Sequence, residues 1–135
     1  MLKKTVTYID YNNVERTEDF YFNLTKAEVV EMELGTTGGF VDMLQKIIDA
    51  KDQPAIIKVF KDMVFKAYGV KSADGKRFIK SKELSEEFAQ TEAYSNIFME
   101  LAFDADAGSA FVKGIIPADL DKTFNEIADK HKKSN

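Results

Sequence analysis

A strand pattern gives way to a helix pattern within the run Asp19-Phe20-Tyr21-Phe22-Asn23-Leu24-Thr25-Lys26-Ala27-Glu28. From Phe20 to Leu24 every second residue is apolar, which is the alternation of a strand that buries one face. Thr25 and Glu28 then stand at the spacing of a capping box, in which each side chain bonds an unpaired backbone N–H at the start of a helix. The sequence therefore predicts a strand that ends at Leu24 and a helix that begins at Thr25.

A second strand-forming segment precedes this run. Thr5 to Tyr11 is rich in β-branched and aromatic residues, and Asn12-Asn13 separates it from the segment Val14 to Leu24. Asparagine tolerates the left-handed backbone region that tight turns need. We therefore expect residues 1–24 to form a β-hairpin.

Beyond the hairpin, the apolar residues mostly recur at helical spacing. Pro54 suits the first turn of a helix, and Ser81 and Thr91 are good cap residues for two more. Asp74-Gly75 interrupts this pattern and predicts a tight turn, as a short hairpin or a structured loop. The expected helices are Thr25–Leu34, Phe40–Lys51, a helix from Pro54 whose apolar repeat runs to Ala67 and which Gly69 closes, Ser81–Gln90, a helix from Thr91 through Leu101, and Ala118–Lys130.

These patterns predict an α+β fold that is mostly α-helical, in which an N-terminal β-hairpin is followed by a bundle of five to six helices. A chain of 135 residues has the usual size of one domain. We expect a single domain over residues 1–135, with the hairpin in 1–24, the helical part in 25–131 and a tail in 132–135.

The composition argues against several classes of function. The net charge of −4 makes nucleic acid an improbable main partner, because phosphate binding needs a basic surface. No apolar run approaches the length of a membrane span, so no membrane partner is expected. The chain has no cysteine and a single histidine, His131. Thiolate metal sites and most acid–base or nucleophilic chemistry therefore lack their side chains.

Two stretches resemble chemical motifs but depart from them in detail, and one group of carboxylates could suggest an acid–base site. Asp104 to Gly108 begins like a calcium loop, yet the twelfth position is Ile115 instead of glutamate. Gly35 to Gly39 lacks the Lys-Ser/Thr of a phosphate-binding loop. A group of carboxylates lies beside lysines on amphipathic helices, where charges usually form a solvated face: Glu83, Glu86, Glu87 and Glu92. We therefore predict no catalytic residue, no metal site and no cofactor.

The densest apolar cluster outside the hairpin is the candidate partner-binding site. It consists of Phe111, Val112, Ile115 and Ile116. Gly114 and Pro117 mark a bend of the chain there. Burial in the core is the commoner role of such residues, and a partner-binding groove is the alternative. On the binding hypothesis, Ile116→Asp abolishes partner binding and leaves the domain folded.

Several stretches together resemble a known family of small phage proteins. They are Tyr8-Ile9-Asp10-Tyr11, Glu18 to Thr25, Asp74-Gly75-Lys76-Arg77-Phe78, Phe88 to Tyr94, Phe98 to Ala102 and Gly114-Ile115-Ile116-Pro117. The chain resembles, over roughly Tyr8 to Leu120, the tail assembly chaperones of siphophages and prophages of Gram-positive bacteria.

The resemblance implies a protein without enzymatic activity that works in the host cytoplasm. Its implied partner is the tape measure protein, with the tail tube protein as a further partner, and self-association stays open. The resemblance also implies that a longer form can arise by ribosomal frameshifting. Two other functions remain open at this point: a structural component of the tail or the head–tail joint, and a small regulatory binding protein of a prophage.

Overall fold

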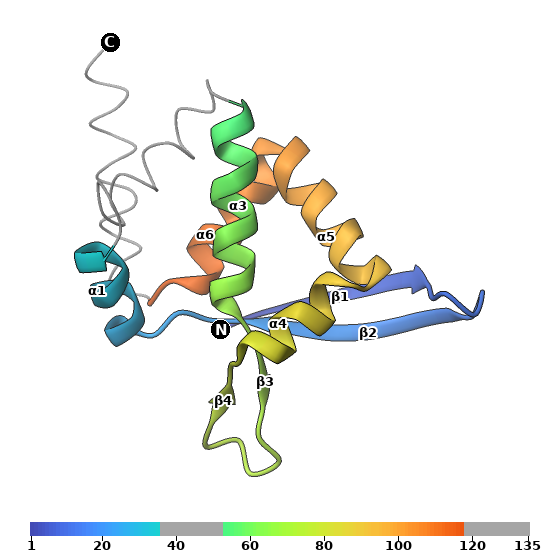
Figure 1. Ribbon diagram of the computed structural model, residues 1–135, viewed down its shortest axis with the longest axis horizontal. Coiled ribbons are helices and arrows are strands. Elements are labelled where there is room, and N and C mark those ends of the chain that lie inside the picture. The colour runs from blue at the N-terminus through green and yellow to red at the C-terminus, as the bar shows by residue number, and fades with distance from the viewer. Residues whose placement is uncertain (36–52, 118–135) are drawn as a thin grey trace.

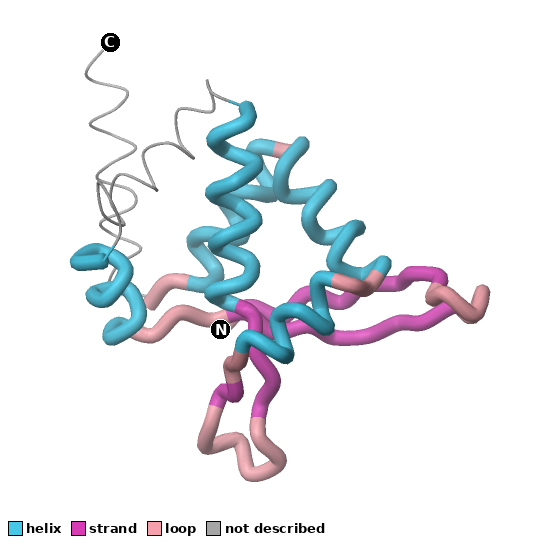
Figure 2. Tube along the Cα trace, viewed as in Figure 1, coloured by secondary structure: helices cyan, strands magenta, loops and turns pink. Residues whose placement is uncertain are grey.

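The computed structural model describes residues 1–35 and 53–117. It confirms the predicted α+β class, with an N-terminal hairpin followed by helices (Figures 1 and 2). The elements are β1 Leu2–Ile9, β2 Glu15–Phe22, α1 Lys26–Gly35, α3 Gln53–Ala67, β3 Tyr68–Lys71, β4 Phe78–Ile79, α4 Lys82–Ala89, α5 Glu92–Phe103 and α6 Ala105–Ile115. The helices predicted over 40–51 and 118–130, and His131, lie outside the described residues.

The N-terminal hairpin forms as predicted. β1 and β2 pair antiparallel from Leu2 opposite Phe22 to Ile9 opposite Glu15. Asn13 takes the left-handed backbone conformation, with φ of 61°, which asparagine tolerates better than most residues. The Asp10 carboxylate accepts the backbone N–H groups of the turn at 2.8 and 3.0 Å. The turn is therefore held by local hydrogen bonds that its own residues supply.

The predicted capping box forms at the junction between hairpin and helix. The backbone N–H of Thr25 donates to the Glu28 carboxylate at 2.9 Å, and the Glu28 N–H donates to the Thr25 hydroxyl at 3.2 Å. Just before it, the Leu24 N–H donates to the Ile115 carbonyl at 2.8 Å. β2 itself ends at Phe22, two residues earlier than predicted, because the backbone of residues 23 and 24 bonds to α3 and α6 instead of to β1.

The sheet has four strands in the order β1-β2-β3-β4. β3 pairs antiparallel with the end of β2. Of the two alternatives predicted for the Asp74-Gly75 turn, the structure has the short hairpin, which joins β3 and β4 with Gly75 at φ of +72°. The prediction that Gly69 closes the third helix is wrong, although the predicted apolar repeat does end together with this helix at Ala67. Helix α3 ends at Ala67, and Gly69 lies in β3, where a Cβ atom would stand 2.7 Å from the Phe78 ring.

Three helices begin at the side-chain caps that the sequence provides. Ser81, Thr91 and Asp104 each accept backbone N–H groups in the first turns of α4, α5 and α6. The bend predicted at Gly114 does not occur there, because Gly114 lies inside α6 against Leu2 of β1. The chain leaves helical geometry only at Ile116, beside Pro117.

The core lies between the helices and one face of the β1–β2 hairpin. In Figure 1, α3, α5 and α6 lie on one side of this hairpin, and β3 and β4 project to the other side. Alternate residues of β1, from Leu2 to Tyr8, are partly buried toward the helices, and the residues between them are exposed. The largest fully buried side chains are Phe22, Phe111, Leu24, Met63, Ile97, Leu101, Ile115, Val64 and Val112.

A candidate partner-binding groove

The four residues predicted to bind a partner are brought together in the core. Phe111, Val112, Ile115 and Ile116 are between 0 and 6% exposed. The Phe111 ring meets the Phe22 ring edge-on, with centroids 5.3 Å apart. In this conformation these side chains offer almost no surface to a partner, so their part in binding stays a prediction.

A surface groove lies instead between α3, α4 and α5. Its volume is about 430 Å³, and its lining is mostly apolar. The lining residues are Lys61, Phe65, Lys82, Ser85, Glu86, Ala89 and Tyr94. This groove is the candidate functional site among the described residues.

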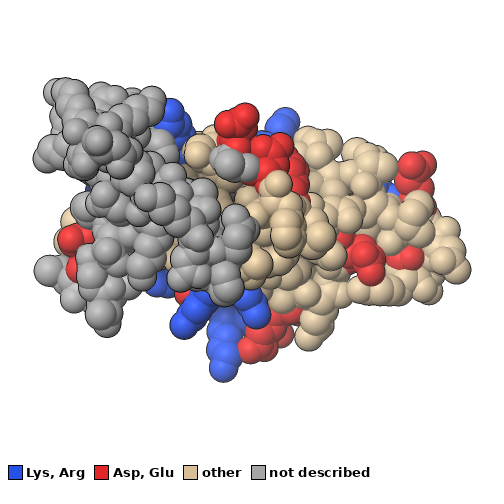
Figure 3. Space-filling view, turned by 90° about the horizontal axis from the view of Figure 1, so that it is seen from above, with Lys and Arg blue, Asp and Glu red and all other residues tan. Residues whose placement is uncertain are grey.

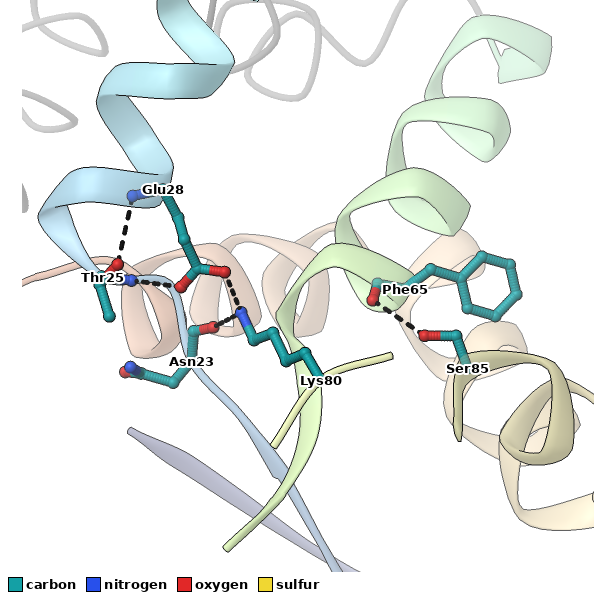
Figure 4. Close-up of polar contacts among 6 residues, drawn as sticks. All are labelled: Asn23, Thr25, Glu28, Phe65, Lys80 and Ser85. Atoms are coloured by element: carbon teal, nitrogen blue, oxygen red, sulfur yellow. Dashed lines mark hydrogen bonds and ion pairs between the residues drawn. The ribbon is translucent and has the colours of Figure 1, made fainter. Parts of the chain in front are cut away.

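Helical spacing explains why these residues share a surface. The four residues from α4 stand at positions i, i+3, i+4 and i+7, which form one face of a helix, and the two from α3 stand one turn apart. The Ser85 hydroxyl reaches the backbone carbonyl of Phe65 at 3.5 Å, which places α4 against α3 (Figure 4). Tyr94 of α5 stacks on Phe65 with ring centroids 5.3 Å apart and an angle of 16°.

The groove has an aromatic floor and a charged rim. Phe65 and Tyr94 are only partly exposed, and burial raises the pKa of the Tyr94 hydroxyl. The ammonium group of Lys61 lies 6.0 Å from the centre of the Phe65 ring. Lys82 and Glu86 are exposed and stand 3.8 Å apart, a separation at which such pairs contribute little. An apolar floor with polar margins is the usual form of a groove that receives an amphipathic helix.

No motif in the sequence marks this groove. The acidic residues of α4 are exposed and form the predicted solvated helix face, but the small residues Ser85 and Ala89 carry no chemical motif. The sequence does contain one indication of the groove, which is the spacing of Ser85 and Ala89. Small residues one helical turn apart leave room for a neighbouring element. Their proximity to Phe65 and Tyr94 is a tertiary contact that local patterns do not contain.

A second hollow lies between the hairpin tip and α5, and its lining is largely polar. It measures about 570 Å³ and is lined by Thr7, Tyr8, Ile9, Asp10, Tyr11, Asn13, Glu92 and Asn96. The Tyr8 hydroxyl donates to the Glu18 carboxylate, which raises the pKa of Tyr8 to about 12. Arg16 and backbone N–H groups hold the pKa of Asp10 below its usual range.

Neither a metal cluster nor a membrane span is found in the part of the chain that the structure describes. No three histidine, aspartate or glutamate side chains gather there in a way that could hold a metal ion. No helix there is both long enough and apolar enough to cross a bilayer.

The structure thus defines a small α+β protein with a helix-lined surface groove. A family model described as phage tail assembly chaperone matches residues 1–135, so the chain belongs to the phage tail assembly chaperone family. This membership confirms the family resemblance that the sequence analysis identified. No curated protein and no solved structure matches the chain.

Proposed function

We propose that this phage tail assembly chaperone binds the tape measure protein without catalysis, in the host cytoplasm, by holding an amphipathic helix in the α3–α4–α5 groove. The observation that carries the proposal is the groove itself, whose apolar floor between Phe65 and Tyr94 is open to the surface. Family membership supports a role in tail assembly and hence a protein partner.

The groove also indicates the chemistry of the bound helix. Its apolar residues would cover Phe65, Ala89 and Tyr94, and acidic residues at its margin would meet the ammonium groups of Lys61 and Lys82. Each such contact is small and therefore weak. Many chaperone copies along one long partner would still cover it stably, because neighbouring sites on one chain raise the effective concentration.

The proposal does not require the predicted residues Phe111, Val112, Ile115 and Ile116. Because they are buried, they could reach a partner only if α6 left the core. The groove needs no such rearrangement, and side-chain movement at its rim is sufficient.

The test is co-expression with the tagged tape measure protein of the same phage, followed by affinity measurement. Ala89→Lys places a charged side chain in the groove, and we expect binding to weaken by about tenfold or more. Gln90→Lys is the matched control, because it adds the same charge at the next, exposed residue outside the groove lining. Equal binding by both variants would contradict the proposal, provided that both unfold at the temperature of the unmodified protein.

A second experiment addresses the longer form that the family resemblance implies. The native gene, with its downstream DNA and an N-terminal tag, is expressed and blotted. A minor product larger than 15.3 kDa is the expected result. A single product would mean that this chaperone acts without a frameshifted form.

A further inference from the structure

Positive charge is concentrated in the β3–β4 hairpin and in the residues that join it to α3 and α4. Residues 66–82 contain six of the 19 lysines and arginines of the chain but only one of its 23 aspartates and glutamates, so this stretch has a net charge of +5. Because the whole chain has a net charge of −4, the rest of it carries −9. The six basic residues are Lys66, Lys71, Lys76, Arg77, Lys80 and Lys82.

The free end of the hairpin presents three of these charges to solvent. β3 and β4 project from the sheet on the side away from α3, α5 and α6 (Figure 1). Lys71, Lys76 and Arg77 are exposed, and none of them forms an ion pair within residues 1–35 and 53–117. Lys80, at the base of the hairpin, is instead neutralised by Glu28. The three outer charges are therefore available to a partner.

The turn of the hairpin engages its own carboxylate and leaves these charges unpaired. The Asp74 carboxylate accepts the Ser72 hydroxyl at 2.6 Å and the backbone N–H of Lys76 at 3.0 Å. The Ser72 hydroxyl accepts the backbone N–H of Arg77 at 3.0 Å. These bonds hold the backbone that carries the two basic side chains in one conformation. A surface that is ordered before binding loses less entropy when a partner arrives.

Aromatic rings lie beside the innermost of the three charges. The ammonium group of Lys71 lies 4.3 Å from the centre of the Tyr21 ring. Phe78 stands directly opposite Lys71 in the β3–β4 ladder, and paired residues share one face of a sheet. Both rings are partly exposed. Aromatic side chains and arginine are enriched where proteins bind one another, so this surface has the composition of a protein interface.

The distribution of charge favours a short acidic segment over a nucleic acid. Proteins that bind duplex DNA commonly neutralise about 6–10 phosphates, more than three exposed charges can supply. A long polyanion would also meet the acidic remainder of the molecule. Figure 3 shows mainly acidic side chains toward the outer end of the β1–β2 hairpin on the face seen from above. A segment with only a few carboxylates needs no more than the β3–β4 hairpin.

We propose that the free end of the β3–β4 hairpin binds a short acidic segment of a partner protein. Its carboxylates would pair with Lys71, Lys76 and Arg77. An apolar side chain between those carboxylates would contact the rings of Tyr21 and Phe78. This surface is separate from the α3–α4–α5 groove and does not depend on the tape measure protein being the partner.

The test uses the whole protein and a capped synthetic peptide of four glutamates around one phenylalanine. Backbone amide resonances are followed by NMR while the peptide is added at low ionic strength, where exposed charges are least screened. We expect the amides of residues 71–78 to shift in a saturable way and those of the groove to stay in place. A peptide with glutamine in place of every glutamate is the control and is expected to cause no shift.

Arg77→Gln and Lys58→Gln form the matched pair of variants, because each removes one exposed positive charge and Lys58 lies in α3, outside the hairpin. We expect Arg77→Gln to weaken peptide binding about threefold and Lys58→Gln to leave it nearly unchanged. Glutamine at all three of Lys71, Lys76 and Arg77 should weaken it about tenfold or more.

Three outcomes would overturn the proposal. One is the absence of shifts in residues 71–78, or equal shifts with the glutamine peptide. Another is equal weakening by Arg77→Gln and Lys58→Gln, which would mean general attraction between opposite charges. The third is tighter binding of the same amides to an oligothymidylate with as many charges as the peptide, which would make nucleic acid the better occupant of the hairpin.

Discussion

The ammonium group of Lys80 lies 2.5 Å from a carboxylate oxygen of Glu28 and 2.7 Å from the backbone carbonyl of Asn23 (Figure 4). The other oxygen of Glu28 accepts the N–H of Thr25 in the capping box. One partly buried carboxylate therefore completes the start of α1 and also ties that start to the chain directly after β4. The junction between strand and helix is held by a contact 52 residues away in sequence.

A double-mutant cycle at this pair measures the contribution of the contact. We expect Lys80→Met and Glu28→Gln to be coupled by about 1 kcal/mol in the free energy of unfolding, because both groups are partly shielded from water. Urea denaturation of the single and double variants gives the coupling. Lys82 and Glu86 serve as the control pair, since both are well exposed and their coupling should be close to zero. Equal coupling in the two cycles would show that shielding is unimportant here.

Acid should weaken the same junction. Burial raises the pKa of Glu28, but hydrogen bonds from Lys80 and from the Thr25 N–H lower it more, so the net pKa lies below its ordinary value of 4.5. A carboxyl group with a depressed pKa in the folded state adds stability that is complete above its unfolded pKa and is lost as the pH falls through the folded pKa. The free energy of unfolding should therefore be steady near neutral pH and fall below about pH 4.5.

Glu28→Gln should show a shallower fall of stability in acid than the unmodified protein. Some dependence on pH should remain, because hydrogen bonds also lower the pKa of Asp10 and of Asp74. Urea titrations at a series of pH values from about 3 to 7 test this expectation. Identical acid slopes for the two proteins would mean that Glu28 has the same pKa in the folded and unfolded chains.

Local sequence was sufficient to predict the elements whose hydrogen bonds are local. The turn at Asn13, the capping box at Thr25 and the helix caps at Ser81 and Thr91 are all closed by residues no more than four positions apart. The family was also predicted, from a resemblance spread over most of the chain.

Contacts between distant segments could not be predicted in the same way. Gly69 follows an apolar helical repeat, where a glycine usually marks the end of a helix. In the structure its role is instead to let the Phe78 ring lie against β3, a contact that only the folded chain shows. The same limit applies to the candidate site. An apolar cluster such as Phe111 to Ile116 has one sequence pattern whether it faces a partner or the core, and the structure shows that it is buried.

Two glycines of α6 should respond differently to alanine. Alanine in a helix is favoured over glycine by about 1 kcal/mol when nothing is in the way. A Cβ atom at Gly108 would lie 2.5 Å from the buried ring of Phe60 and 3.1 Å from the Leu101 carbonyl, whereas at Gly114 it would lie 3.0 Å from a terminal methyl group of Leu2. Overpacking in a closed core costs about 1–3 kcal/mol. We expect Gly108→Ala to lower the midpoint of thermal unfolding clearly and Gly114→Ala to change it less. The reverse order would show that Phe60 moves aside more easily than Leu2.

Ile116→Asp distinguishes the two roles considered for the apolar cluster at the end of α6. Ile116 is 6% exposed, and the neighbouring Ile115 carbonyl accepts the Leu24 N–H at the hairpin junction. A carboxylate buried there without a partner should destabilise the fold by about 4 kcal/mol or more. We therefore expect loss of cooperative unfolding or a large fall in its midpoint, measured by circular dichroism, and loss of partner binding only as a consequence. Ile116→Val, which keeps the site apolar, should cost about 1 kcal/mol. A folded Ile116→Asp protein of near-normal stability that no longer bound the tape measure protein would support the binding hypothesis instead, and would place the contact at α6 rather than in the groove.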